Sequence, residues 1–174
     1  MSKFELVKGS CVLEEVDAVV NAANVYLSSG GGVCGAIFKN AGYSKLSEAC
    51  SKINTPLNVG DAVITPAFNI TNAKYIIHAV GPDFGRNPNG FEELFYAYYN
   101  SIKVLKENNL HSIAFPLISS CIYGGNLETP VTNSFNMFVK AYNKFVEDNS
   151  DYEINVKLCA FTDNEYEEIR LLLN

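Results

Sequence analysis

Three consecutive glycines, Gly30, Gly31 and Gly32, stand directly before a segment with helical spacing. Glycine costs backbone entropy, but without a Cβ it lets the chain approach a ligand closely with its N–H groups exposed. The helix that follows has a dipole that favours anionic oxygen at its start. These residues predict either a phosphate cradle or a tight, flexible turn, because a lone glycine cluster is a weak motif.

A second loop of small residues supports the cradle. The segment SSCIYGG, at residues 119–125, also leaves an apolar strand and precedes a helix. Two such loops facing each other could hold a diphosphate from both sides. Neither loop has the G-x-x-x-x-G-K-[ST] pattern or a proper G-x-G-x-x-G pattern, so ATP or GTP hydrolysis and dinucleotide redox chemistry are not indicated.

Two asparagines flank the glycine loop on its N-terminal side. The amides of Asn21 and Asn24 can donate and accept hydrogen bonds, which suits sugar hydroxyls. Asparagine also satisfies its own local backbone in turns. We expect a structural role for Asn21 and a ligand role for Asn24.

Cys34 lies inside the start of the helix, where a thiolate can have a lowered pKa and act as a nucleophile. No histidine lies near it in the sequence, and free cysteines are most often small buried groups. We therefore expect Cys34 to fill space behind the glycine loop. His78 is expected to be a core or supporting group, and His111 a surface residue at the start of a strand.

The elements that must position these residues follow from the apolar patterns. Apolar runs predict strands at residues 4–7, 16–20, 62–65, 75–80, 112–118 and 154–161. Helical spacing predicts helices at residues 32–41, 46–53, 91–105 and 131–146, and a capping box at Thr162 and Glu165 opens another that extends to residue 173. Residues 85–90 are predicted to be a polar surface loop.

Strands alternating with long amphipathic helices predict an α/β fold with a mostly parallel sheet between two helical layers. Ligands of such sheets bind beyond the carboxyl ends of the strands. That position is predicted for residues 21–32, for residues 119–126 and for the residues that follow Phe161.

Length and charge limit the possible functions. The 174 residues are predicted to form one domain, residues 1–174, of a free-standing protein that we expect to be a monomer. A net charge of −6 argues against a sequence-independent nucleic-acid binder, which needs a surplus of Lys and Arg. An anionic small ligand is still possible, because backbone N–H groups can hold phosphate without a charged side chain.

The cysteine pattern predicts neither a disulfide framework nor a zinc site. The 5 cysteines form no C-x-x-C pair and only 2 histidines accompany them, so we expect no metal and no cofactor. The chain begins Met-Ser-Lys without an apolar signal segment, and no apolar run approaches the roughly 20 residues of a membrane span. The expected location is the cytoplasm, without a membrane partner.

Three segments, in this order and spacing, resemble the macrodomain family, whose members bind ADP-ribose: VVNAANVYLSSGGGVCGAI, YIIHAVGP and SIAFPLISSCIYGG. The similarity covers essentially the whole chain. It implies a three-layer α/β/α sandwich with a mixed, mostly parallel central sheet and an ADP-ribose cleft at its crest.

The resemblance also implies the roles of individual residues. Asn24 would bond the distal ribose, the glycine loop would wrap the distal ribose and diphosphate, and the second loop would cup the diphosphate with its aromatic beside that ribose. Phe161 would stack on adenine. The implied ADP-ribose contacts are Ser10, Cys11, Asn24, Gly30, Gly31, Gly32, Val33, Ser119, Ser120, Cys121, Ile122, Tyr123 and Phe161.

The sequence departs from the family pattern in three places. Ser10 stands where many members have an Asp that accepts a hydrogen bond from the adenine amino group, and a hydroxyl is a weaker partner than a carboxylate. Hydrolytic members often have an Asp and a His where this chain has Cys34 and Phe38. Cys121 replaces a usual Gly, which would narrow the diphosphate loop.

We expect hydrolysis of ADP-ribose esters despite these departures. In the mechanism implied by the family, the ligand's own phosphate holds the attacking water, so binding and orientation provide most of the effect. Asn24, Gly32 and Tyr123 would then be the catalytic residues. The expected ligands are ADP-ribose, O-acetyl-ADP-ribose and mono-ADP-ribosylated proteins; the alternative is an ADP-ribose reader without turnover.

Overall fold

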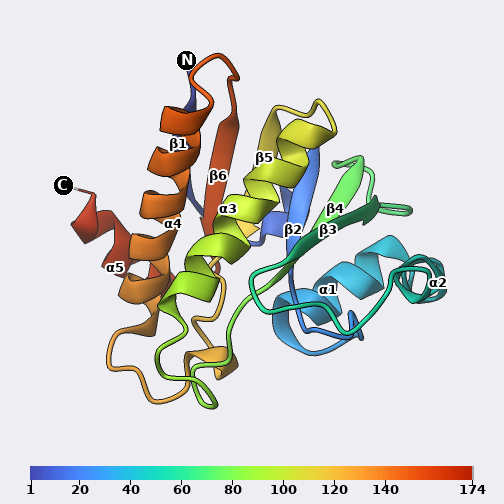
Figure 1. The fold of residues 1–174 in the computed structure, drawn as a ribbon, viewed down its shortest axis with the longest axis horizontal. Helices are drawn as coiled ribbons and strands as arrows, with labels where there is room; N and C mark the ends of the chain where they lie inside the picture. The colour runs from blue at the N-terminus through green and yellow to red at the C-terminus, as the bar shows by residue number, and fades with distance from the viewer. Residues whose placement is uncertain (174) are drawn as a thin grey trace.

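The computed structural model describes residues 1–173 and contains a single mixed sheet flanked by helices (Figure 1). Its strands are β1 (Lys3–Lys8), β2 (Ala18–Ala23), β3 (Ala62–Pro66), β4 (Tyr75–Val80), β5 (Ser112–Pro116) and β6 (Asn155–Ala160). Its helices are α1 (Gly32–Ala41), α2 (Tyr43–Ser51), α3 (Phe91–Glu107), α4 (Pro130–Asp148) and α5 (Asp163–Leu172), with short 3₁₀ turns η1 (Cys11–Leu13) and η2 (Ile122–Gly124).

The strands lie in the order β1-β6-β5-β2-β4-β3. All neighbouring pairs are parallel except β3 and β4, which are antiparallel. The carboxyl ends of β1, β6, β5, β2 and β4 therefore lie in that sequence along one edge of the sheet. The predicted mixed, mostly parallel sheet is confirmed.

The sheet separates two apolar cores. Helices α3 and α4 pack on one face, where Tyr98, Phe115 and Phe138 are fully buried. Helices α1 and α2 and the turn η1 cover the other face around Ile37, Phe38 and other buried side chains. Both faces of the central strands are thus buried, which explains why their sequences are continuously apolar rather than alternating.

Helix boundaries follow local backbone geometry. Gly42 ends α1 with a φ of 99°, a left-handed value that favours glycine, and its carbonyl accepts the N–H of Leu46 to begin α2. Helix α2 therefore begins at Tyr43, earlier than the predicted residue 46. Strand β5 ends at Pro116 rather than at residue 118, because the N–H of Ile118 donates to the hydroxyl of Tyr98 instead of to a strand.

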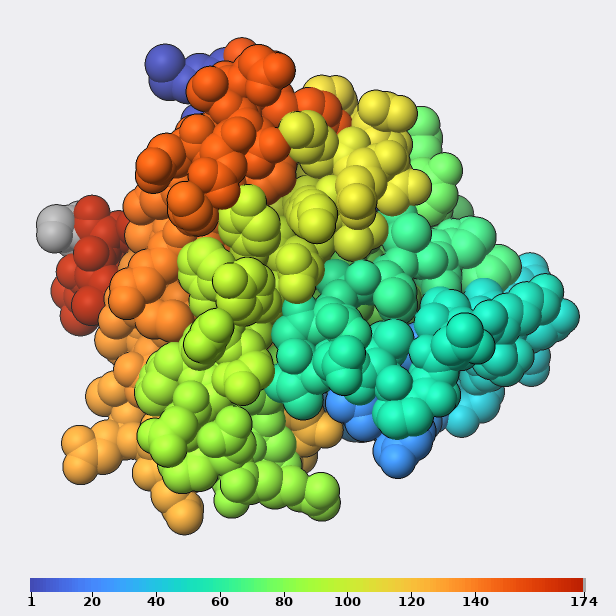
Figure 2. Space-filling view, in the orientation of Figure 1, coloured from blue at the N-terminus to red at the C-terminus, as the bar shows by residue number. Residues whose placement is uncertain are grey.

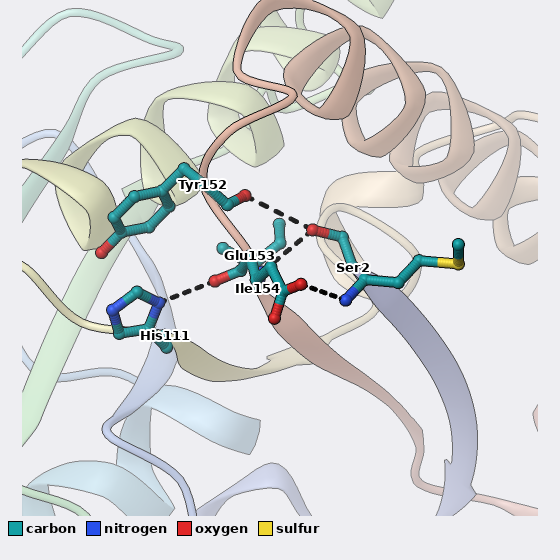
Figure 3. Close-up of polar contacts among 6 residues, drawn as sticks. Ser2, His111, Tyr152, Glu153 and Ile154 are labelled. Carbon is teal, nitrogen blue, oxygen red and sulfur yellow. Dashed lines mark hydrogen bonds and ion pairs between the residues drawn. The ribbon is translucent and has the colours of Figure 1, made fainter.

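The edge of the sheet away from these carboxyl ends is formed by the amino ends of the parallel strands. There the starts of β1 and β5 lie beside the residues that lead into β6 (Figure 3). There Nδ1 of His111 donates to the carbonyl of Glu153 at 2.7 Å, and the N-terminal ammonium contacts the carboxylate of the same residue. His111 is an exposed residue directly before β5, as predicted, and lies far from the loops that follow the strands. Within residues 1–173, no helix combines the length and apolarity needed to cross a membrane.

Candidate functional site

The glycine loop enters α1 without a capping side chain. Gly31 occupies the position before the helix, and no side chain accepts a hydrogen bond there. The first N–H groups of a helix have no partner within the helix, so those of Gly32, Val33 and Cys34 are available to an external acceptor. With the helix dipole, they form a site suited to an anionic oxygen.

The glycines of this loop border open space. A Cβ built on Gly30, Gly31 or Gly32 would meet no atom within 4 Å, so the packing of the loop itself does not exclude a side chain. Gly32 has a φ of 58°, which disfavours other residues. Gly35 has a packing role instead, because a Cβ there would lie 2.7 Å from the carbonyl of Gly30. The first three glycines thus leave room for a ligand, as the cradle interpretation requires.

Asn24 organises the loop between β2 and the glycines. Its Oδ1 accepts the N–H groups of Tyr26 at 3.1 Å and Ser28 at 3.2 Å, and its Nδ2 donates to the hydroxyl of Ser28 at 3.0 Å. The amide is partly exposed at the carboxyl end of β2. The turn role that asparagine commonly plays is therefore present, and a ligand would meet an amide already oriented by its own loop.

Asn21 is buried within the sheet and contacts neighbouring strands. Its amide lies 3.0 Å from Nδ1 of His78, whose Nε2 lies 2.9 Å from the hydroxyl of Thr65. Burial lowers the pKa of His78 to about 4, so this imidazole is neutral at physiological pH. Asn21 and His78 are structural, as predicted. The Oδ1 atom of Asn21 is buried and has no hydrogen-bond partner among residues 1–173.

Cys34 is not activated as a nucleophile. Its side chain is only 7% exposed, and its thiol lies 3.7 Å from the carbonyl of Ser28. Burial raises the pKa of this thiol, and the nearby N–H of Gly30 and amide of Asn21 oppose that shift only in part. The environment supports the space-filling interpretation of Cys34.

In the loop after β5, the two serine side chains form hydrogen bonds within the protein. The hydroxyl of Ser119 donates to the carbonyl of Pro82 at 2.7 Å, and that of Ser120 to the carbonyl of Leu117 at 2.9 Å. Cys121 and Ile122 are exposed. The hydroxyls of Ser119 and Ser120 are therefore used inside the protein, whereas the exposed residues of this loop are Cys121 and Ile122.

The residues expected at the adenine end lie at the ends of β1 and β6. Ser10 begins η1, and its hydroxyl accepts the N–H of Val12 at 3.3 Å. Cys11 is only 1% exposed, and its thiol lies against the carbonyl of Val20, so the side chain of Cys11 does not face a ligand. Phe161 follows β6 and is 69% exposed, which leaves its ring free to stack on a planar group.

A cavity of about 450 Å³ adjoins Asn24 and Tyr123. Sequence reasoning missed much of its lining, which includes Tyr26, Val59, Pro82, Asp83, Arg86 and Glu93. Residues 85–90 were expected to be only a polar surface loop, and that expectation was incomplete because Arg86 and Asn87 line this cavity. One sequence feature could have indicated this part of the cavity: the Gly81-Pro82 turn, which directly follows the buried strand β4.

The structure gathers most of the predicted residues at one edge of the sheet. The glycine loop, Asn24, the 119–123 loop and Phe161 all follow carboxyl ends of parallel strands. Within residues 1–173, no group of three or more His, Cys, Asp or Glu side chains is arranged to hold a metal ion. The arrangement offers backbone donors for an anion, an amide for hydroxyl groups and exposed aromatic rings.

Comparisons with known proteins agree with this geometry. The Macro domain family model matches residues 20–132. A macro domain-containing protein of Caldanaerobacter subterraneus is 42% identical over 169 residues, which cover 95% of this chain and 92% of the relative. The human ADP-ribose glycohydrolase MACROD2 is 47% identical over 124 residues, which cover 70% of this chain and only 28% of that protein.

Solved structures have the same fold. A macrodomain of Oceanobacillus iheyensis with ADP has a TM-score of 0.87 and 31% identity, and the match covers 99% of this chain and 92% of that one. A Trypanosoma brucei macrodomain in complex with ADP-ribose has a TM-score of 0.84 and 29% identity, covering 98% of this chain and 69% of that one. The expected α/β/α architecture is thereby confirmed.

Proposed function

Because the chain belongs to the macro domain family, we propose that it binds ADP-ribose and hydrolyses ADP-ribose esters. The observation that carries the proposal is the uncapped start of α1, where Gly30, Gly31 and Gly32 border open space next to free backbone N–H groups. Such a site holds phosphate without a cationic side chain, which suits a chain with a net charge of −6. Solved relatives with ADP or ADP-ribose bound support the same ligand class.

The proposed ligand runs along the strand ends. Adenine lies between Ser10 and Phe161, the diphosphate between the glycine loop and residues 119–123, and the distal ribose between Asn24 and Tyr123. This order follows the sheet order β1-β6-β5-β2. Each group then meets matching chemistry: an aromatic ring, backbone N–H groups, and an amide with a phenol.

In the proposed reaction, the bound phosphate orients a water molecule towards the ester carried by the distal ribose. The oxygen of water bonds either to the distal ribose carbon or to the acyl carbon of the ester, and the C–O bond between that carbon and the ester oxygen breaks. Water thus supplies OH to one fragment and its remaining proton to the other, which gives ADP-ribose and a free carboxylic acid. Asn24 holds the ribose, Tyr123 limits its movement, and Gly32 lets the chain approach it closely. Orientation supplies the rate enhancement, so no protein nucleophile is needed and the buried Cys34 need not react.

The alternative is a reader that binds ADP-ribose without turnover. Two residues favour it: Cys34, where hydrolytic relatives often carry an Asp, and Cys121, where a Gly is usual. Position 34 lies in the first turn of α1, so Cys34→Asp would place a carboxylate near the positive end of the helix dipole. That variant is the natural test of whether the substitution limits turnover.

A panel of substrates separates the two functions. Purified protein is incubated with peptides ADP-ribosylated on Glu or Asp and with O-acetyl-ADP-ribose, while calorimetry measures ADP-ribose binding. We expect turnover of at least one ester, with loss of turnover in Asn24→Ala. Tight ADP-ribose binding without turnover, unchanged in Cys34→Asp, would select the reader instead.

Ser10 raises the question of nucleotide preference. Its hydroxyl caps η1 by accepting the N–H of Val12, and an Asp at this position could retain that bond while offering a stronger acceptor to an amino group. We expect Ser10→Asp to improve ADP-ribose affinity. Unchanged affinity would mean that the hydroxyl does not limit adenine recognition.

A further inference from the structure

A closed ring of hydrogen bonds lies at the start of the loop after β5. The N–H of Ile118 donates to the hydroxyl of Tyr98 at 2.9 Å, and the hydroxyl of Ser134 donates to the carbonyl of Ile118 at 2.5 Å. The hydroxyls of Tyr98 and Ser134 are 2.7 Å apart. Because Ser134 uses its single proton on Ile118, the bond between the two hydroxyls takes its proton from Tyr98.

This ring is buried between two helices and the sheet. Tyr98 in α3 and Ser134 in α4 are 0% exposed, and Ile118 is 1% exposed. Figure 2 shows the yellow-green α3 and the orange α4 side by side on one face of the molecule. Burial raises the pKa of Tyr98, so its hydroxyl keeps the proton that it donates to Ser134. Both backbone polar groups of Ile118 are thus held by side chains from two different helices.

The residue that follows the ring has an unusual backbone conformation. Ser119 has a φ of 58°, a left-handed value that residues other than glycine seldom adopt. Its hydroxyl donates to the carbonyl of Pro82 at 2.7 Å, and a Cβ on Gly81 would lie 2.5 Å from that hydroxyl. Such a conformation persists only where the surrounding contacts determine it. Here those contacts are the ring around Ile118 on one side and the turn after β4 on the other.

The backbone at Ser119 sets the direction in which residues 120–123 leave the sheet. The far end of this loop is held as well, because the N–H of Phe84 donates to the carbonyl of Tyr123 at 2.8 Å. The loop proposed to hold the diphosphate is therefore fixed at both ends before a ligand arrives. A loop ordered in advance loses less conformational entropy on binding, which favours affinity.

We propose that Tyr98 and Ser134 are positioning residues for the diphosphate: by holding Ile118 they keep Ser119 left-handed and the 119–123 loop in its binding shape. The inference rests on the proposed function and adds to it two buried residues that act through the backbone and touch no ligand. Removal of either hydroxyl breaks the ring, so the two substitutions should affect the same loop.

Two serine substitutions test the proposal. Ser134→Ala removes the donor to the carbonyl of Ile118. Ser101→Ala is the matched control, because Ser101 is also 0% exposed in a helix but its hydroxyl donates to the carbonyl of Ala97 within α3, at 2.6 Å. The probes are ADP and adenosine, titrated into each folded protein and followed by NMR. Only ADP carries the diphosphate, so a loosened loop should affect ADP more than adenosine.

We expect Ser134→Ala to weaken ADP binding about 10-fold, equivalent to about 1.4 kcal/mol, and to leave adenosine affinity within about twofold. Ser101→Ala should change neither affinity. Equal losses for ADP and adenosine in Ser134→Ala would overturn the proposal, because the substitution would then act on the whole protein. Parent-like ADP affinity in Ser134→Ala would overturn it as well.

Tyr98→Phe is the second variant, since it keeps the ring of the side chain and removes the hydroxyl. It should also weaken ADP more than adenosine. Because Tyr98 and Ser134 act through the same residue, the double variant should bind ADP within about twofold of the weaker single variant. Losses that multiply in the double variant would refute a shared action through Ile118.

Amide hydrogen exchange without ligand separates this proposal from the proposed function. The N–H of Gly124 donates to the carbonyl of Cys121 within the loop, at 3.0 Å. In Ser134→Ala this amide should exchange at least about fivefold faster than in the parent protein, while amides of β2 keep their rates. Equal acceleration in the loop and in β2, or none in the loop, would overturn the proposal. If the parent protein does not bind ADP, the proposed function fails, and this exchange measurement alone decides whether the ring orders the loop.

Discussion

The backbone N–H of Phe84 donates a hydrogen bond to the carbonyl of Tyr123 across 2.8 Å. This bond joins the segment after β4 to the loop after β5, over the strand β2 that lies between them in the sheet. A Cβ on Gly125 would lie 2.5 Å from the nitrogen of Gly85, so the two segments touch through their backbones. The loop proposed to hold the diphosphate and the wall of the adjoining cavity are therefore one connected unit.

Asn24 has both a turn role and a proposed ligand role, and two substitutions separate them. Asn24→Asp keeps an acceptor for the N–H groups of Tyr26 and Ser28 but loses the Nδ2 donor, whereas Asn24→Ala loses both. We expect Asn24→Asp to weaken ADP-ribose binding about 10-fold, with a melting temperature near that of the parent protein. Asn24→Ala should lower both the affinity for ADP-ribose and the melting temperature. Calorimetry and thermal denaturation provide the measurements, and full affinity in Asn24→Asp would assign Asn24 to the turn alone.

Gly31→Ala should raise the free energy of unfolding and lower the affinity for ADP-ribose. Gly31 has a φ of −86°, which alanine adopts readily, and its Cβ would meet no atom within 4 Å. The variant should be more stable by about 0.4–1 kcal/mol, because alanine restricts the unfolded chain. Its methyl group would project into the space proposed for the diphosphate and reduce ADP-ribose affinity. Gly32→Ala is the contrasting control, since a φ of 58° makes that substitution destabilising.

Urea denaturation and calorimetry measure these two effects for each glycine variant. Parent-like ADP-ribose affinity in Gly31→Ala would show that no ligand approaches this part of the loop.

Alkylation should distinguish the cysteines by exposure and pKa. Cys121 is exposed in the loop after β5, whereas Cys34 is buried and its burial raises the pKa of the thiol. Brief treatment of the native protein with iodoacetamide near pH 7.5 should modify Cys121 first, and ADP-ribose should protect it. Mass spectrometry of the digested protein gives the order. Modification of Cys34 as fast as Cys121 would revive the nucleophile interpretation.

The stability of the protein should depend on pH through His78. Burial lowers the pKa of this imidazole to about 4 in the folded state, against an ordinary value of about 6.5 when unfolded. Above about pH 6.5 both states are neutral and the contribution is constant. As the pH falls from about 6.5 to 4, only the unfolded state takes up the proton, so the free energy of unfolding falls by roughly 3 kcal/mol.

Urea denaturation at a series of pH values measures this effect. His78→Gln removes the titrating group, so its stability should fall by roughly 3 kcal/mol less than that of the parent between pH 7 and 4. His111→Gln, at an exposed position, is the matched control and should keep the slope of the parent. Parallel profiles for the parent and His78→Gln would contradict the prediction.

Much of the fold could be predicted because its signals are local. The continuous apolar run at Tyr75–Val80, the glycine that ends α1 and the capping box at Thr162 depend on residues only a few positions apart. The errors lie at element ends such as the start of α2 and the end of β5. The end of β5 depended on a distant partner, the hydroxyl of Tyr98 that accepts the N–H of Ile118, whereas the start of α2 depended on the backbone geometry of Gly42.

The sequence by itself predicted the candidate site: residue types and spacing indicated the glycine loop, Asn24 and the 119–123 loop, and the resemblance to the macrodomain family added Phe161. Only the tertiary structure decided what lies beside them. Val59, Asp83 and Glu93 are separated in the chain by several elements, and the antiparallel pairing of β3 with β4 and the packing of α3 bring them to one cavity. Local patterns depend on neighbours in the chain. A cavity depends instead on the order of the strands in the sheet, because that order decides which strand ends lie side by side.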